Sequence, residues 1–247
     1  MAAERNGAFR IVGGHPALDL VNTVAPRRPE GGGHIEYLPT PGDLLAWARR
    51  IRLVDEAEAD RVAAAWAASP DAAVQALAAA VDIREAVYRV LARRIGLTSA
   101  ADAAVAADGA DGGGDRDGGA EVAAAGLAPA LERLALRWTA AAGRSRLVPA
   151  EDGPSAVRLA VGDVPALLIP DRLAHACVDF LRTGEIGRVR ACPIEEGGCG
   201  WLFLDHSRNR SRRWCAMADC GSQAKARRLT ARRRTARATG EHTDTGS

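Results

Sequence analysis

The sequence predicts a mainly α-helical N-terminal domain with a small β element, followed by a small module that cysteines hold together. Aromatic residues make up only 4% of the chain, whereas small and aliphatic residues abound, which favours helices packed through small side chains. Apolar residues recur at helical spacing through much of positions 16–182. At 247 residues the chain can hold one core of ordinary size and one appended module. Four cysteines lie close together near the C-terminus: Cys192, Cys199, Cys215 and Cys220.

The first helices begin at local sequence signals. Pro16 suits the first turn of a helix that follows an apolar run and two glycines. Thr40 is a good N-cap because an acid, Asp43, stands three residues later. Helices with an apolar face are expected next over residues 55–68, 71–96, 127–142 and 164–182.

Two segments interrupt the helical pattern. Residues 96–119 are mainly glycine, aspartate and alanine, so burial cannot offset the entropy of ordering them, and we expect a disordered, protease-sensitive loop. Residues 146–148 and 156–161 are predicted as two short strands joined by a turn-rich segment, which form the small β element. These patterns predict a helical domain over residues 1–186, the cysteine module over 187–238 and a disordered tail over 239–247.

Charge is distributed unevenly along the chain. Eleven basic residues between Ser207 and Arg237 accompany a single acid, Asp219, so this stretch carries +10 while the whole chain carries +2. The rest of the chain is therefore acidic. A basic stretch on an acidic body is typical of a protein that binds nucleic acid through one part of its surface.

The cysteine quartet favours a structural zinc site over a pair of disulfides, with a redox disulfide role as the alternative. A glycine-rich loop lets the thiolates of Cys192 and Cys199 converge on one ion. The apolar strand 201–204 is expected to pair with residues 212–215 in a hairpin, and Asp219 is expected to cap a helix that begins at the last cysteine. Together these parts predict a treble-clef-like zinc finger, which Zn²⁺ would hold together because so small a module cannot fold by burial alone.

Two groups of residues also match patterns of known families. The cysteines, with the segments 201–205, 207–209 and 212–215, resemble the CGNR zinc finger. The run Leu18-Asp19-Leu20-Val21-Asn22-Thr23 is similar to the signature of the ABATE domain, which precedes this finger in bacterial proteins. The resemblance covers nearly the whole chain. It implies a stress-related transcription regulator in which a ligand-sensing or assembly domain is joined to a DNA-binding finger.

The chain departs from the CGNR pattern in two places. The tetrad that gives the finger its name reads Cys-Gly-Ser-Gln at positions 220–223, and the first cysteine loop holds six residues instead of four. Two glycines in the longer loop can absorb the extra length. Gln223 changes any base contact at the start of the helix, since glutamine pairs naturally with adenine and arginine with guanine.

We expect the finger to bind double-stranded DNA, with arginines that supply salt-sensitive phosphate affinity. The helix that follows the last cysteine is polar on all sides, so it would gain order by lying along phosphates. RNA recognition by the same finger is the alternative, and an unbound, solvated arginine-rich tail is another. The predicted contact residues are Arg208, Arg210, Arg212, Arg213, Gln223, Lys225, Arg227, Arg228 and Arg232.

Other features carry weaker signals. Asp19 and Asn22 stand three apart on one helix, so they are predicted either to line a pocket for a small-molecule effector or to make buried hydrogen bonds. Trp201 and Trp214 are expected to form the core of the finger, although they could stack on bases. No catalytic constellation is recognisable, so an enzyme in the N-terminal domain is the least favoured alternative. With no apolar leader or membrane span in the sequence, we expect a cytoplasmic protein, and a homodimer is left open.

Overall fold

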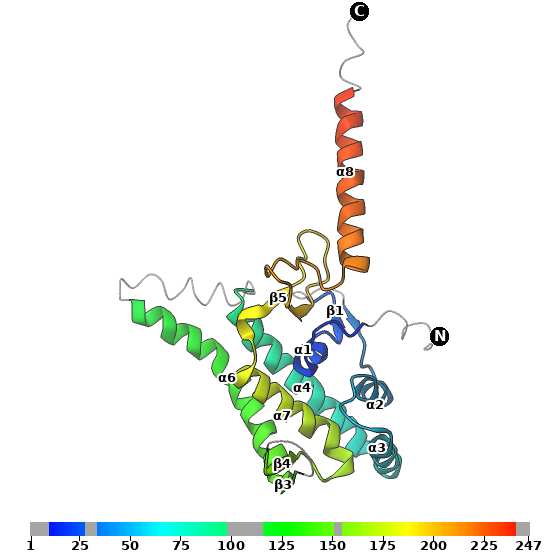
Figure 1. The fold of residues 1–247 in the computed structure, drawn as a ribbon, viewed down its shortest axis with the longest axis vertical. Coiled ribbons are helices and arrows are strands. Elements are labelled where there is room, and N and C mark those ends of the chain that lie inside the picture. Colours follow the sequence, from blue (N-terminus) through cyan, green and yellow to red (C-terminus); the bar gives the residue numbers. More distant parts are fainter. Residues whose placement is uncertain (1–9, 28–33, 98–115, 151–154, 241–247) are drawn as a thin grey trace, which may run out of the picture.

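The computed structural model describes residues 10–27, 34–97, 116–150 and 155–240, and for 116–126 and 232–240 it describes the main chain alone. Within these ranges the protein is mainly helical with three two-stranded sheets, as the sequence predicts. Long helices form the body, and the C-terminal helix projects from a small β-containing module at one end (Figure 1).

The first two helices that the local signals predict are present. α1 spans Pro16–Val21, and α2 spans Pro41–Arg50 behind a full capping box between Thr40 and Asp43. The remaining helices of the body are α3 (Glu56–Ala68), α4 (Pro70–Arg94), α6 (Arg116–Gly143) and α7 (Leu168–Thr183).

Three antiparallel strand pairs accompany the helices. β1 (Val24–Ala25) pairs with β2 (Ile35–Glu36), and β3 (Arg146–Pro149) pairs with β4 (Val157–Ala160) as predicted. The third pair lies in the C-terminal module, where β5 (Val189–Ala191) pairs with β6 (Leu202–Leu204).

The predicted loop over 96–119 needs a correction at both ends. Residues 116–119 lie in the first turn of α6, and the side chain of Leu97 packs against the core. Residues 98–115 fall outside the described part of the chain. The prediction followed local glycine content, which is a weak guide where the following residues continue a helix.

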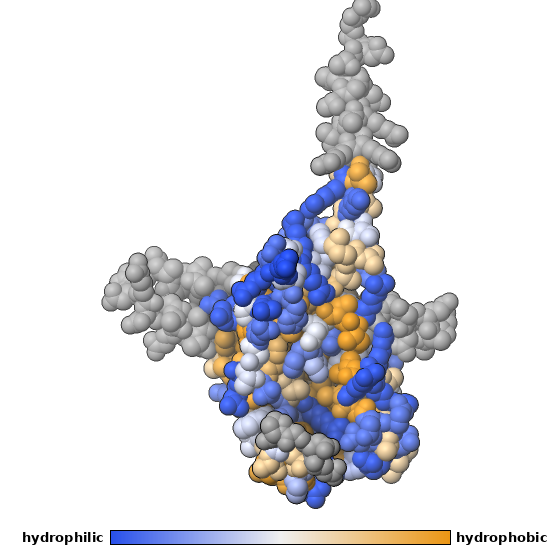
Figure 2. Space-filling model, viewed as in Figure 1, coloured by the Kyte–Doolittle hydropathy of each residue, from blue (hydrophilic) through white to orange (hydrophobic). Residues whose placement is uncertain are grey.

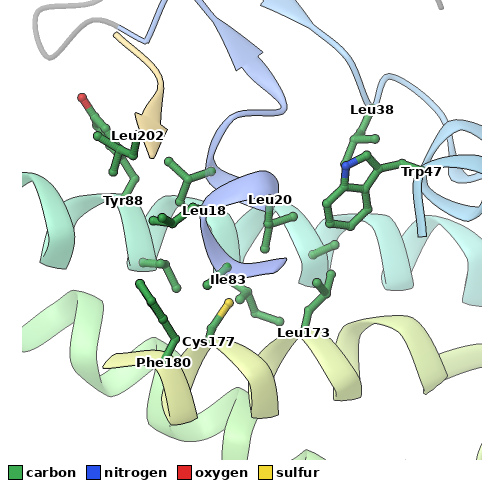
Figure 3. Close-up of a cluster of buried hydrophobic side chains, with 14 of the residues drawn as sticks. Leu18, Leu20, Leu38, Trp47, Ile83, Tyr88, Leu173, Cys177, Phe180 and Leu202 are labelled. Carbon is green, nitrogen blue, oxygen red and sulfur yellow. The ribbon is translucent and has the colours of Figure 1, made fainter. Parts of the chain in front are cut away.

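The hydrophobic core lies between α1, α4 and α7. α4 packs against both α6 and α7, and α1 lies across α4 and α7. Figure 3 shows Leu18 and Leu20 of α1 pointing towards Ile83 of α4 and Cys177 of α7. Leu18, Leu20 and Cys177 are fully buried, and burial raises the pKa of Cys177 to about 12, so this cysteine is an unreactive part of the core. α1 is therefore a central element despite its length of six residues.

A partly buried ion-pair network connects α4 to the N-terminal strands. Arg84 donates two hydrogen bonds of 2.8 Å to the Glu36 carboxylate, and it also contacts Glu85. Arg27 pairs with Glu85 at 3.1 Å and stacks over the ring of Tyr88 at 4.1 Å. The network fixes the segment that runs from β1 to Arg27, and this segment lies against the C-terminal module.

Candidate metal centre and nucleic-acid interface

The first two cysteines flank the loop between β5 and β6. Cys192 directly follows β5, and its N–H donates to the carbonyl of Trp201 at 2.9 Å, which closes the loop. Gly197 and Gly200 adopt φ values of +90° and +75°, which favour glycine. At Gly200 a Cβ would lie 2.2 Å from the Arg27 carbonyl oxygen, so a side chain has no room there. The glycines thus let both thiols turn to the same side.

The second pair of cysteines is positioned differently from the prediction. Residues 212–215 form no strand, because the partner of β6 is β5. Cys220 lies in a π-helical turn, Met217–Gly221, and the following helix α8 spans Ser222–Gly240. Asp219 therefore lies inside this turn instead of capping the helix, and its carboxylate pairs with Arg10 at 2.5 Å.

The four cysteine sulfurs form a compact cluster that suits a metal ion. All four lie within 4.8 Å of one another, with 3.4 Å between Cys199 and Cys215 and 3.7 Å between Cys215 and Cys220. Four thiolates about 2.3 Å from a tetrahedral zinc ion would stand about 3.8 Å apart. The donor set and its spacing therefore fit Zn²⁺.

The electrostatics of the cluster point in the same direction. Burial raises the pKa of Cys220, and hydrogen bonds from the Cys199 and Cys215 thiols lower the pKa of Cys192. Like charges at this separation oppose the simultaneous ionisation of four neighbouring thiols. A divalent cation would compensate the negative charge and allow all four sulfurs to ionise.

Asp205 and Arg212 hold the chain segment that leads to Cys215. The buried carboxylate of Asp205 accepts hydrogen bonds from the N–H of Ser207 at 2.9 Å and from that of Arg212 at 3.1 Å, so it organises the turn. The Arg212 side chain donates to the carbonyls of Leu204, Trp214 and Cys215 and lies over the Phe203 ring at 4.4 Å. Arg212 was predicted to contact nucleic acid, and all three nitrogens of its guanidinium group donate to carbonyls of the finger.

The other predicted nucleic-acid residues differ in their surroundings. Arg208, Arg210, Gln223 and Lys225 are exposed. Arg213 and Arg228 both pair with the carboxylate of Glu196. Arg227 lies over the backbone of Gly197, and the side chain of Arg232 is outside the described part of the structure. Figure 2 shows hydrophilic residues gathered on the module at the foot of α8.

The two tryptophans of the finger form part of its core, as expected. Trp201 is 6% exposed and Trp214 is 8% exposed, so neither ring presents a face on which a base could stack. Trp201 also donates from Nε1 to the carbonyl of Val24 at 2.8 Å and meets Tyr37 edge-to-face.

Asp19 and Asn22 are buried and make hydrogen bonds within the protein. The Asp19 carboxylate accepts from the N–H of Gly13 at 2.8 Å, and burial raises the pKa of this carboxyl group. Asn22 donates to the carbonyl of Leu202 and accepts from its N–H, both at 2.8 Å. Of the two roles that the sequence left open for this pair, the contacts favour the structural one.

Asn22 belongs to a seam that joins the helical domain to the finger. One edge of β6 pairs with β5, and the other edge is covered by the Asn22 side chain and by the carbonyl of Gly13, which accepts from Leu204 at 2.9 Å. The N–H of Arg27 donates to the carbonyl of Cys199 at 2.8 Å. The sequence gives no periodic signal for this seam, because its partners lie about 180 positions apart.

Comparison with known proteins agrees with this architecture. Residues 188–233 match the family description "CGNR zinc finger", and residues 14–184 match ABATE, described as "Putative stress-induced transcription regulator". A search among curated proteins finds no match. None of the helices in the described ranges is both long and apolar enough to cross a membrane. The ABATE match covers more than half of the chain and the finger follows it in order, so the chain belongs to the ABATE family and carries a CGNR zinc finger.

Proposed function

We propose that this protein is a zinc-dependent transcription regulator that binds double-stranded DNA through its finger and α8. The family description is that of a regulator, and the four sulfurs fit zinc. The helical domain would supply the regulatory half by sensing a ligand or by mediating assembly, as the family resemblance implies.

The observation that carries the DNA-binding proposal is the character of α8. Its 19 residues include seven basic residues and no acid, and the helix projects away from the helical domain (Figure 1). A helix of this length extends about 28 Å, and an α-helix fits the major groove of B-DNA. Because α8 has no apolar stripe with which to pack on its own domain, a polyanion is the partner that suits it best.

The role of each basic residue follows from its surroundings. Arg208, Arg210 and Lys225 are exposed cations in or beside the finger and would supply phosphate contacts. Gln223 lies on the first turn of α8, next to the metal cluster, where it would approach base edges. Arg212 is excluded from the proposed contact set because its donors bind main-chain carbonyls.

Titration of the zinc-loaded full chain tests this function. Duplex DNA, single-stranded DNA and RNA would be titrated at two salt concentrations by fluorescence anisotropy. We expect duplex binding that weakens with salt. Replacing Arg227, Arg228 and Arg232 by glutamine should flatten the log–log salt dependence by up to about one unit for each phosphate that is no longer neutralised.

A matched variant controls for net charge. Replacing Arg50, Arg89 and Arg93, which are exposed on the helical domain, removes the same charge and should leave the salt dependence nearly unchanged. Preferential binding of RNA would favour the alternative function. Absence of binding to any of the three probes at low salt would remove the proposal.

A further inference from the structure

Glu196 occupies an unusual position among the basic residues of the finger. Its two carboxylate oxygens pair with different arginines, Oε1 with Arg213 and Oε2 with Arg228. The arginines come from separate elements, since Arg213 stands two residues before the metal ligand Cys215 whereas Arg228 lies on α8. One acid thus joins the metal cluster to the helix that we propose binds DNA.

The loop that carries Glu196 is held in place from both sides. It lies between Cys192 and Cys199, so the cysteine cluster fixes its two ends. At Gly197 a Cβ would lie 2.1 Å from a guanidinium nitrogen of Arg227, so the loop backbone and α8 are in close contact. The loop therefore places an acid directly against the foot of the helix.

The arrangement resembles the binding of a phosphate group. Arginine recognises carboxylates and phosphates with the same fork of N–H donors, and a phosphodiester offers two anionic oxygens as a carboxylate does. The side chains of Arg213 and Arg228 are 58% and 60% exposed, so a phosphate can approach both. While Glu196 holds them, the three groups together carry +1 instead of the +2 of the arginine pair.

We propose that Arg213 and Arg228 form a phosphate subsite, which Glu196 occupies in the free protein and which a phosphodiester of the DNA backbone takes over on binding. This inference rests on the proposed function. It makes Glu196 an internal competitor that holds α8 in position before binding and reduces affinity for nucleic acid.

The test compares two charge-matched variants of the zinc-loaded full chain. Glu196→Gln removes the competing carboxylate, and Glu195→Gln removes the same charge from the adjacent, exposed position in the loop. With a duplex of random sequence at low salt, we expect Glu196→Gln to bind about three- to tenfold more tightly than Glu195→Gln, the effect of about two exposed ion pairs. Zinc content and thermal unfolding would confirm that both variants are folded.

A double-mutant cycle assigns the gain to the two arginines. Replacing Arg213 and Arg228 by alanine should weaken binding more in the Glu196→Gln background than in the wild-type background. If Glu196→Gln gains no more than Glu195→Gln, or if its gain survives removal of both arginines, the subsite is refuted while wild-type duplex binding still supports the proposed function. If no variant binds duplex DNA, both proposals fall.

Discussion

Replacing Asn22 by alanine tests whether the seam between the helical domain and the finger stabilises the fold. Asn22 is fully buried and makes two hydrogen bonds of 2.8 Å to the main chain of Leu202, which is also fully buried. Alanine would leave one N–H and one carbonyl of β6 without partners and without access to water. Each such group costs about 1–3 kcal/mol, so the free energy of unfolding should fall by about 2–6 kcal/mol.

This loss is a large fraction of the stability of a typical domain, about 5–15 kcal/mol, so it is readily measured. The assay is urea unfolding of the zinc-loaded chain, and Asn209→Ala, at an exposed position, is the matched control. If Asn22 served chiefly to bind an effector, its removal would leave the ligand-free protein nearly as stable as the wild type. A loss below about 1 kcal/mol with zinc content unchanged would therefore refute the structural role.

Three further predictions concern the finger and the helical domain. Elemental analysis of the purified protein should find about one zinc ion per chain. Cys215→Ser should lose this zinc, because three thiolates leave the tetrahedron incomplete. Stoichiometric zinc in the variant would contradict this. Arg212→Lys should lower zinc retention against a chelator, since lysine cannot reach three carbonyls at once. The control variant Arg208→Ala should leave zinc retention unchanged. Equal zinc retention in the two variants would contradict this. A hydrogen bond from Arg172 holds the pKa of Glu58 below its ordinary value of 4.5, so this stabilisation is complete above that pH and is lost as the pH falls through the lowered pKa. Glu58→Gln should therefore flatten the acid side of the unfolding free-energy profile, and a parallel profile would contradict this.

The sequence predicts those parts of the fold that depend on local signals. The predicted N-cap Thr40 marks the start of α2, because a cap satisfies orphan backbone donors at one defined position, and the helix predicted over 55–68 matches α3 to within a residue. The spacing of the four cysteines predicts the cluster, and the structure places their sulfurs within 4.8 Å of one another. The predicted domain boundaries stay predictions.

The sequence does not predict features that depend on contacts between distant residues. The pairing of β5 with β6 was missed because three residues, Val189–Ala191, show too little alternation to identify a strand. The carbonyl contacts of Arg212 could not be predicted, because a guanidinium that binds carbonyls and one that binds a phosphate look alike in sequence. The role of Asn22 stayed open in the sequence because its partner, Leu202, lies 180 positions away.

The seam also determines how the function of the finger can be tested. β6 is buried along its whole length, and its free edge is completed by Asn22 and Gly13 of the helical domain. A protein truncated before β5 would lack the finger. Its helical domain would expose the surface that covers β6 and would leave Val24 and Asn22 without their partners. Such a truncated protein would lose stability as well as the metal site, so its failure to bind DNA would not assign binding to the finger. Point variants of exposed residues, such as Arg208 and Lys225, remove the proposed phosphate contacts while leaving the seam intact, and they separate the two effects.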